Sequence, residues 1–221
     1  MRFSPLFQLF ASVNMSDMAF GTFFDLILSG EVLMYQNCSL FLCHRKALIK
    51  KMKYRDEKDK CYGVVGMAIA LNVWDADDMY SDITIDAQGF DCINFTYDYF
   101  FSGSEAISPR VTLDHALKVF KVTMGLTISN LLCRTIVGDR AHVKPDDKKQ
   151  LLDIFSEQAR NDFSLTDDEC RTIFDKSYNY LLRLYSHGEV RRMVADFAAA
   201  LQKRRRMSEH EVAEMLAILN Q

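Results

Sequence analysis

Residues 111–137 read VTLDHALKVFKVTMGLTISNLLCRTIV, and this stretch decides the fold. Its apolar side chains recur at steps of three or four residues, which is the spacing of one face of an α-helix: Leu113, Leu117, Phe120, Met124, Ile128 and Leu131. No charged residue occurs between Val122 and Cys133, so the second half is apolar on nearly every side. A helix of this kind is buried by its neighbours on several faces. We therefore expect a central core helix.

Residues at the two ends of this stretch are typical of the start and the end of a helix. Ser108-Pro109 precedes it, and a proline disfavours helical backbone in the residue before it. Thr112 is the expected N-cap, Gly138 is placed for the left-handed residue after the last turn, and Arg134 suits the negative end of the helix. The uncharged stretch is shorter than the roughly 20 residues that a membrane span needs. Because the segment also holds β-branched residues, a strand is the alternative for part of it.

The composition is that of a globular protein with a substantial core. The chain has 221 residues, of which 49% are hydrophobic and 26% charged, and its net charge is −3. These values are ordinary for a globular domain, and they give no general preference for nucleic acid or membranes. Only three prolines and nine glycines are present, which argues against a disordered chain.

The six cysteines are predicted to be reduced core thiols. No two of them form a C-x-x-C pair, and most lie in apolar runs: Cys38, Cys43, Cys61, Cys92, Cys133 and Cys170. A disulfide framework is usually denser than this and occurs in a shorter chain. We therefore expect a cytoplasmic protein.

The first 14 residues are predicted to be an N-terminal extension. Arg2 is followed by an apolar stretch that Pro5 interrupts, and the small-residue cleavage site of a signal peptide is not clear. Helices are expected next, at about 16–29 and 31–53. Residues 62–74 (YGVVGMAIALNVW) are apolar throughout, so their periodicity does not distinguish helix from strand. We favour a helix, in which Gly63, Gly66 and Ala70 form a face for close packing.

The clearest β signal is a hairpin at residues 83–101. Polar and apolar residues alternate from Ile83, Gln88-Gly89 offers a turn, and a second alternating run follows. Five residues of that run share one face: Ile93, Phe95, Tyr97, Tyr99 and Phe101. Because an isolated two-stranded ribbon is not stable in water, we expect it to pack on the central helix. The alternative is a ligand groove lined by the two tyrosines.

Residues 141–221 are predicted to form a helical C-terminal unit. Pro145 suits the first turn of a helix, and Thr166-x-x-Glu169 and Ser208-x-x-Glu211 are capping boxes. The expected helices lie at about 146–159, 166–185, 189–206 and from 208 onwards.

The predicted fold class is therefore α+β and helix-dominated, with a small antiparallel hairpin on a central buried helix. Residues 15–140 would form the α+β body. The C-terminal helices would be a separate unit, or part of one continuous domain with that body.

A run of acidic residues follows the apolar segment 62–74. Its sharpest part is a group of four aspartates: Asp75, Asp77, Asp78 and Asp82. Clustered carboxylates are the ligands of a hard cation such as Mg²⁺, which could activate water for phosphoester hydrolysis. The spacing does not match an EF-hand loop, since Tyr80 stands where a glycine is required. A solvated acidic loop without a metal is the interpretation we favour.

A basic run at residues 45–60 balances this acidic stretch. It carries eight Lys or Arg residues against three acids. Its cationic side chains, among them Lys50, Lys51 and Lys53, could neutralise the phosphates of a nucleic-acid backbone. It could also pair with the acidic stretch, within the fold or across a dimer. We favour the pairing because one interaction then explains both features, although each surface pair contributes little.

A second basic cluster ends one of the expected helices: Lys203, Arg204, Arg205 and Arg206. A basic helical face can bind nucleic acid or anionic lipid. The alternative is that these cations complement the negative end of the helix dipole. No aromatic residue interleaves with them, which disfavours binding of single strands by stacking.

These patterns give one leading hypothesis and two alternatives. We expect a non-catalytic cytoplasmic protein that works through protein-protein contacts, as a homodimer or with a protein partner, without a cofactor and away from membranes. The first alternative is a phosphohydrolase with Mg²⁺ at the Asp75–Asp82 cluster. The second is a nucleic-acid binder that uses the two basic clusters.

Overall fold

The central helix predicted from residues 111–137 is present in the computed structural model as α6 (Pro109–Leu132). Its uncharged middle is buried as predicted, since every residue from Val122 to Asn130 is shielded from solvent. The helix begins at Pro109, so the prediction of Thr112 as N-cap was wrong. Proline is well placed in a first turn, because its ring fixes a helical φ and its missing N–H would be unpaired there anyway.

The structure describes residues 53–100 and 109–220. The predicted N-terminal extension, the helix expected at 16–29, and Cys38 and Cys43 lie outside this part of the chain. The chain divides into two compact units, residues 1–42 and 43–221. Residues 141–221, expected to be a helical unit, belong to the same unit as α6.

Beyond Leu132 the helix continues as a wider π-helical turn, η3 (Cys133–Gly138). Its end is closed by backbone N–H donors of Asp139 and Ala141, both at 2.9 Å from carbonyl oxygens of the turn. The left-handed residue after this turn is Arg140, with φ of 54°. The prediction that Gly138 takes that conformation was therefore wrong, because the wide turn delays the reversal by two residues.

The ambiguous segment 62–74 is helical, as favoured, and forms most of α4 (Glu57–Val73). Its glycines allow a close approach to α6. A Cβ at Gly66 would lie 2.6 Å from the carbonyl oxygen of Ser129, and one at Gly63 would lie 2.7 Å from the Asn130 amide. The Ser129 hydroxyl contacts both the Gly66 carbonyl and the Tyr185 hydroxyl, at 2.5 Å each. The two helices thus pack through small residues and buried hydrogen bonds.

A small antiparallel sheet has the strand order β2-β1-β3, from β1 (Tyr80–Thr84), β2 (Ile93–Phe95) and β3 (Arg206–Ser208). The β1–β2 pair confirms the predicted antiparallel pairing, with Ile83 opposite Ile93. The connection is not the expected two-residue turn, because the short helix η2 (Gly89–Cys92) occupies it and Gly89 has φ of 59°.

The second strand stops sooner than its alternating pattern predicted. Thr96 bonds back to the Asp78 and Met79 carbonyls, and the one-turn helix α5 (Tyr97–Phe100) follows. Tyr99 is 3% exposed and its hydroxyl lies 2.7 Å from that of Thr123 on α6, whereas Tyr97 is 66% exposed. The two tyrosines therefore do not share one face, and α5 rather than the strands meets α6 there. The sheet itself packs on α4 and α10.

The C-terminal elements are α7 (Pro145–Phe163), α8 (Asp167–Ser186), α9 (Gly188–Arg204), α10 (Glu209–Leu216) and η4 (Ala217–Asn220). Both predicted capping boxes are present, at Thr166 and Ser208. The helix expected to reach Arg206 ends at Arg204, because Arg205 is left-handed with φ of 65° and Arg206 enters β3.

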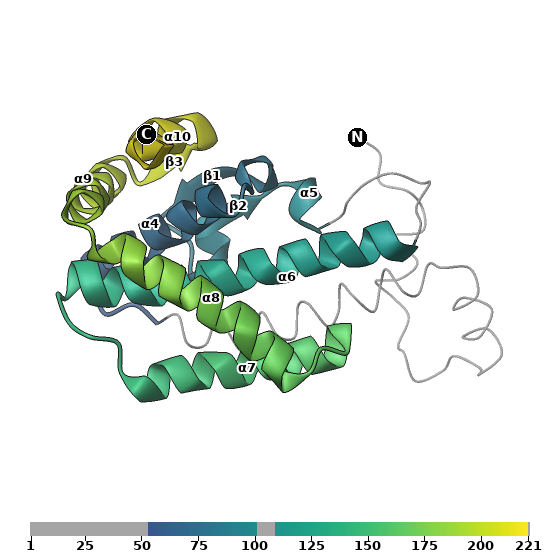
Figure 1. Cartoon of the computed structure of the whole chain (residues 1–221). Coiled ribbons are helices and arrows are strands. Elements are labelled where there is room, and N and C mark those ends of the chain that lie inside the picture. Colours follow the sequence, from purple (N-terminus) through teal and green to yellow (C-terminus); the bar gives the residue numbers. More distant parts are fainter. Residues whose placement is uncertain (1–52, 101–108, 221) are drawn as a thin grey trace, which may run out of the picture. The chain divides into compact units, whose positions relative to one another are not determined.

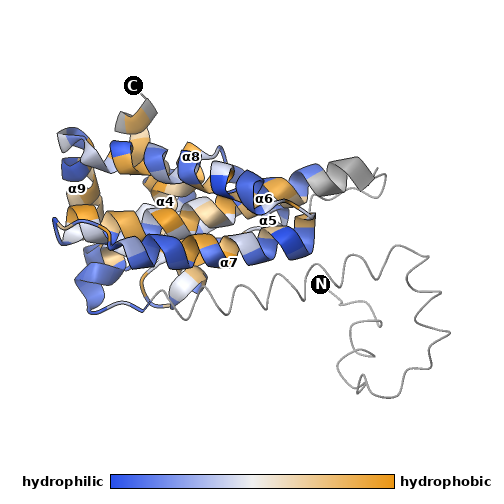
Figure 2. Cartoon of the chain, turned by 60° about the horizontal axis from the view of Figure 1, so that its bottom comes forward, coloured by the Kyte–Doolittle hydropathy of each residue, from blue (hydrophilic) through white to orange (hydrophobic). Residues whose placement is uncertain are grey.

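These elements enclose α6 (Figure 1). In that view α4 and the sheet lie on one side of α6 and α7 on the other, while α8 crosses it. Hydrophilic residues follow much of α7 and α8, whereas α4 is largely apolar (Figure 2). Within the described residues, the segment 114–138 has the length and composition to cross a membrane. However, 72% of its apolar window is buried inside the fold, as in a core helix.

Candidate functional site

The four aspartates proposed as metal ligands lie around the start of the sheet. Asp75 is left-handed after α4, Asp77 and Asp78 open η1 (Asp77–Met79), and Asp82 is in β1. Burial raises the pKa of the Asp77 carboxyl. In the part of the chain that the structure describes, no three His, Cys, Asp or Glu side chains are grouped to hold a metal ion.

Asp82 instead forms an ion pair with Arg206, which lies 124 residues later in the chain. Arg206 donates to its two oxygens from Nε and Nη2, both at 2.8 Å, and Asn94 donates at 2.6 Å. Burial alone would raise the pKa of the Asp82 carboxyl, but these donors and the charge of Arg206 lower it. Asp82 therefore acts as the acceptor that ties β3 to β1 and β2.

The three arginines of the Lys203–Arg206 cluster pair with different acidic residues. Arg204 pairs with Glu211 at 2.7 Å, and Arg205 bridges Asp86 at 2.5 Å and Glu57 at 3.2 Å. The ion pairs of Asp82 and Asp86 thus go to C-terminal arginines. Arg55, from the basic run 45–60, pairs with Asp59 and Asp139 instead. Lys50 and Lys51 lie outside the described residues.

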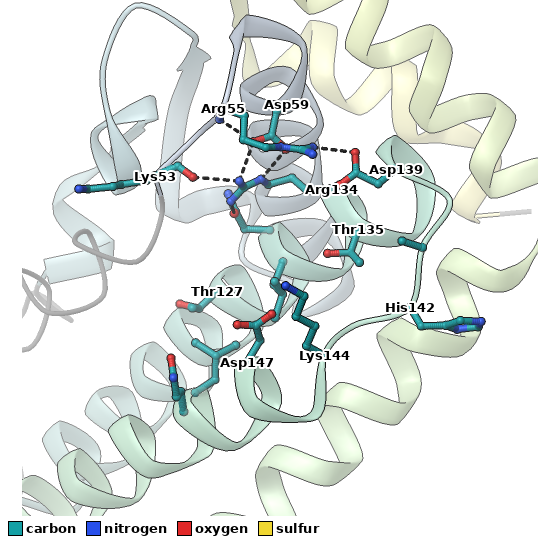
Figure 3. A pocket seen from close by; sticks show the side chains of 15 residues that line it. Lys53, Arg55, Asp59, Thr127, Arg134, Thr135, Asp139, His142, Lys144 and Asp147 are labelled. Carbon is teal, nitrogen blue, oxygen red and sulfur yellow. Dashed lines mark hydrogen bonds and ion pairs between the residues drawn. The ribbon is translucent and has the colours of Figure 1, made fainter.

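A cleft of about 370 Å³, lined mainly by polar and charged residues, opens between α6, η3 and α7, and we call it the α6–α7 cleft (Figure 3). Lys53 and the start of α4 reach it from one side, and the 139–144 loop closes another. The cleft coincides with the π-helical turn, and such turns are frequent at functional sites.

A buried ion pair forms one wall of the cleft. Arg134 donates to the two oxygens of Asp59 from Nε at 2.9 Å and from Nη2 at 2.6 Å. The Asp59 side chain is only 2% exposed and that of Arg134 15%. Burial alone would raise the pKa of Asp59, but hydrogen bonds from Arg134 and Arg55 outweigh it and lower the pKa to about 2. The pair is therefore ionised at neutral pH.

Further contacts hold Arg134 in place. Its Nη2 also donates to the Lys53 carbonyl at 2.9 Å, and its guanidinium lies 4.9 Å from the centre of the Tyr54 ring. Asn130 donates to the Tyr54 hydroxyl at 3.0 Å and accepts from Arg134. These groups satisfy much of one another's hydrogen-bonding capacity, so the polar groups available to a ligand come from the rest of the lining.

Those groups come from α6 and from the start of α7. The side chains of Thr127, Thr135, Lys144 and Asp147 lie around the cleft, whereas Lys53 and His142 point away from it (Figure 3). Leu131 and Leu151 add an apolar floor. Of these lining residues, only Lys53 was predicted from the sequence as a site residue. The lining extends from Lys53 to Leu151, so its residues come from segments nearly 100 residues apart, and none belongs to a recognisable motif.

A second concave surface lies between α9 and α10, and we call it the α9–α10 groove. It has a volume of about 550 Å³ and is lined by Glu189, Arg192, Met193, Asp196, Glu214 and Met215. Met193 is buried and Met215 is half-buried. Two methionines therefore line the groove beside three carboxylates and one arginine, and Met215 is the more exposed of the two.

The described cysteines Cys61, Cys92, Cys133 and Cys170 are free and buried. Burial raises the pKa of the Cys61 and Cys92 thiols to about 11, and it raises those of Cys133 and Cys170 as well. Such thiols stay protonated at neutral pH, and a protonated thiol is a poor nucleophile. They fill the core.

No family model, curated protein or solved structure matches this chain significantly.

Proposed function

We propose that this is a non-catalytic cytoplasmic protein that acts by binding a partner protein. The α9–α10 groove carries the proposal. Methionine side chains are flexible and polarisable, so they adapt to varied apolar surfaces and are common where proteins bind helices. The groove is lined by two of them, of which Met215 is the more exposed, next to three acidic side chains.

The charge of the groove indicates the chemistry of the partner. Glu189, Asp196 and Glu214 outnumber Arg192, so the rim attracts a cationic surface. An amphipathic helix places apolar residues on one face and basic residues at its edges, which matches a methionine floor with an acidic rim. We therefore assign to the groove a basic amphipathic helix of a partner protein.

The charged residues that were considered as metal or nucleic-acid ligands support the same proposal. Asp82, Arg205 and Arg206 are occupied by one another or by neighbouring residues within the fold. Their ion pairs join β1, β3 and α4, so the charged clusters stabilise the arrangement of these elements.

The test is titration of the full chain with a synthetic helical peptide that carries leucine on one face and lysine at its edges. We expect binding, and no binding of the same peptide with glutamate in place of lysine. Glu214→Lys and Met215→Asp should each weaken the affinity about tenfold, through charge repulsion and loss of apolar contact. Glu157→Lys is the matched control, because it makes the same charge change at an exposed position of α7 that does not line the groove.

Two results would contradict the proposal. One is an unchanged affinity for the lysine peptide in the Glu214→Lys and Met215→Asp proteins. The other is a concentration-dependent dimer in light scattering that Met215→Asp dissociates, because the groove would then hold a second copy of this chain.

A further inference from the structure

The α6–α7 cleft has the size and chemistry of a small-molecule site, independently of the α9–α10 groove. Its volume of about 370 Å³ falls within the range of ligand pockets, roughly 300–1,000 Å³. We propose that it binds a small hydroxylated organic anion, a molecule with one carboxylate and several hydroxyl groups on a short carbon chain.

One cation of the lining, Lys144, is placed to bind a negative charge on the ligand. Among the described lining residues, four are Lys or Arg and three are Asp. Arg134 neutralises Asp59, and Arg55 bridges Asp59 and Asp139. Of the remaining cations, Lys53 points away from the cleft, whereas Lys144 lies over it (Figure 3). Lys144 is therefore the group that would bind the carboxylate.

The other groups suit hydroxyls rather than a second charge. Thr127 donates its hydroxyl hydrogen to the Thr123 carbonyl at 2.9 Å, so its oxygen is left to accept. Thr135 and Asp147 line the same cleft as Lys144 (Figure 3), and they offer a donor and acceptors within it. A second anionic group would meet the Asp147 carboxylate, which disfavours dianions.

The wall of the cleft is fixed before any ligand arrives. Arg134, Asp59, Asn130 and Tyr54 hold one another through the hydrogen bonds given above. Leu131 and Leu151 supply apolar surface for the carbon chain of the ligand. A rigid wall reduces the entropy lost on binding, so a small ligand can be held by few contacts.

The probe is gluconate, with glucose and inorganic phosphate as comparison compounds, titrated into the full chain by calorimetry. We expect gluconate to bind and the other two to bind at least about tenfold more weakly, since each lacks one of the two features that the cleft recognises. Lys144→Met should lower the gluconate affinity about tenfold by removing a charge-assisted hydrogen bond. Thr135→Val should lower it about threefold.

Lys149→Met is the matched control, because Lys149 is exposed on α7 and does not line the cleft. It should bind gluconate as the unmodified protein does. The proposal is overturned if gluconate does not bind, if phosphate or glucose binds equally well, or if Lys144→Met leaves the gluconate affinity unchanged.

Discussion

Two arginine–aspartate pairs in this molecule have nearly the same geometry and different surroundings. Arg134 meets Asp59 at 2.9 and 2.6 Å, and Arg206 meets Asp82 at 2.8 and 2.8 Å, each through Nε and Nη2. The side chains of the first pair are 15% and 2% exposed, and those of the second are 66% and 11% exposed. Burial, not hydrogen-bond geometry, therefore distinguishes the two pairs.

The difference decides what each pair contributes. Water can take the place of an exposed partner, so a surface pair adds little to stability. A buried charge that loses its partner has no such replacement, and this makes its removal costly. We expect the Asp59–Arg134 pair to be necessary for the packing of α4 against η3. The Asp82–Arg206 pair should orient β3 and add little to the free energy of unfolding.

The largest effect is expected from Asp59→Ala. It leaves the Arg134 guanidinium with little exposure and without its carboxylate, which should lower the free energy of unfolding by about 3 kcal/mol. Urea denaturation followed by circular dichroism measures this. A loss no larger than that of Asp82→Ala would show that burial does not separate the two pairs.

The same pair should give an acid-sensitive contribution to stability. The pKa of Asp59 is about 2 in the folded protein, below its ordinary value near 4. Its contribution is therefore complete above the unfolded-state value and is lost as the pH falls from about 4 towards 2. Denaturation of the Asp59→Ala protein across this window should vary less with pH than that of the unmodified protein.

An intermediate effect is expected from Gly66→Ala, which tests the packing that brings the buried pair together. The added Cβ would lie 2.6 Å from the Ser129 carbonyl oxygen and 2.7 Å from the Cys133 Cβ, so α4 and α6 must separate. We expect a loss of about 2 kcal/mol. Gly188→Ala is the control, because nothing lies within 4 Å of its Cβ position. Equal stability of the two variants would contradict this close approach.

The smallest effect is expected from Asp82→Ala. It removes the partner of the exposed Arg206, which water can then solvate, and leaves Asn94 without its acceptor, at a loss of about 1 kcal/mol. The loss should shrink in 1 M salt, where charges are screened over roughly 3 Å, whereas that of Asp59→Ala should persist. Denaturation of both variants with and without salt compares them directly, and equal salt dependence would refute the distinction.

Local patterns predicted most of the described helices, and the starts of α8 and α10. The 3.6-residue periodicity found α6, and the hydroxyl–glutamate spacing found the caps of α8 and α10. The apolar pattern of residues 62–74 did not settle its type. The structure shows why the helix forms: Gly63 and Gly66 contact Asn130 and Ser129 of α6, and that face exists only at helical spacing.

Features made by distant residues were not predictable in this way. β3 is three residues long, and Asp82, which pairs with its Arg206, lies 124 residues away, so Arg206 resembled the end of a helix. The run after Phe95 kept a strand-like alternation, yet Tyr99 turns inward to reach Thr123. The α6–α7 cleft likewise depends on Asp59 and Arg134, which nothing in the sequence connects.

The position of β3 has a consequence for the order of folding. Because β1 is the middle strand, a nascent chain that has not yet reached residues 206–208 exposes one unpaired edge of β1. Exposed strand edges pair readily with other chains. The Arg205 and Arg206 ion pairs thus close the sheet long after β1 has been synthesised, and a chain that stops before them should be prone to self-association.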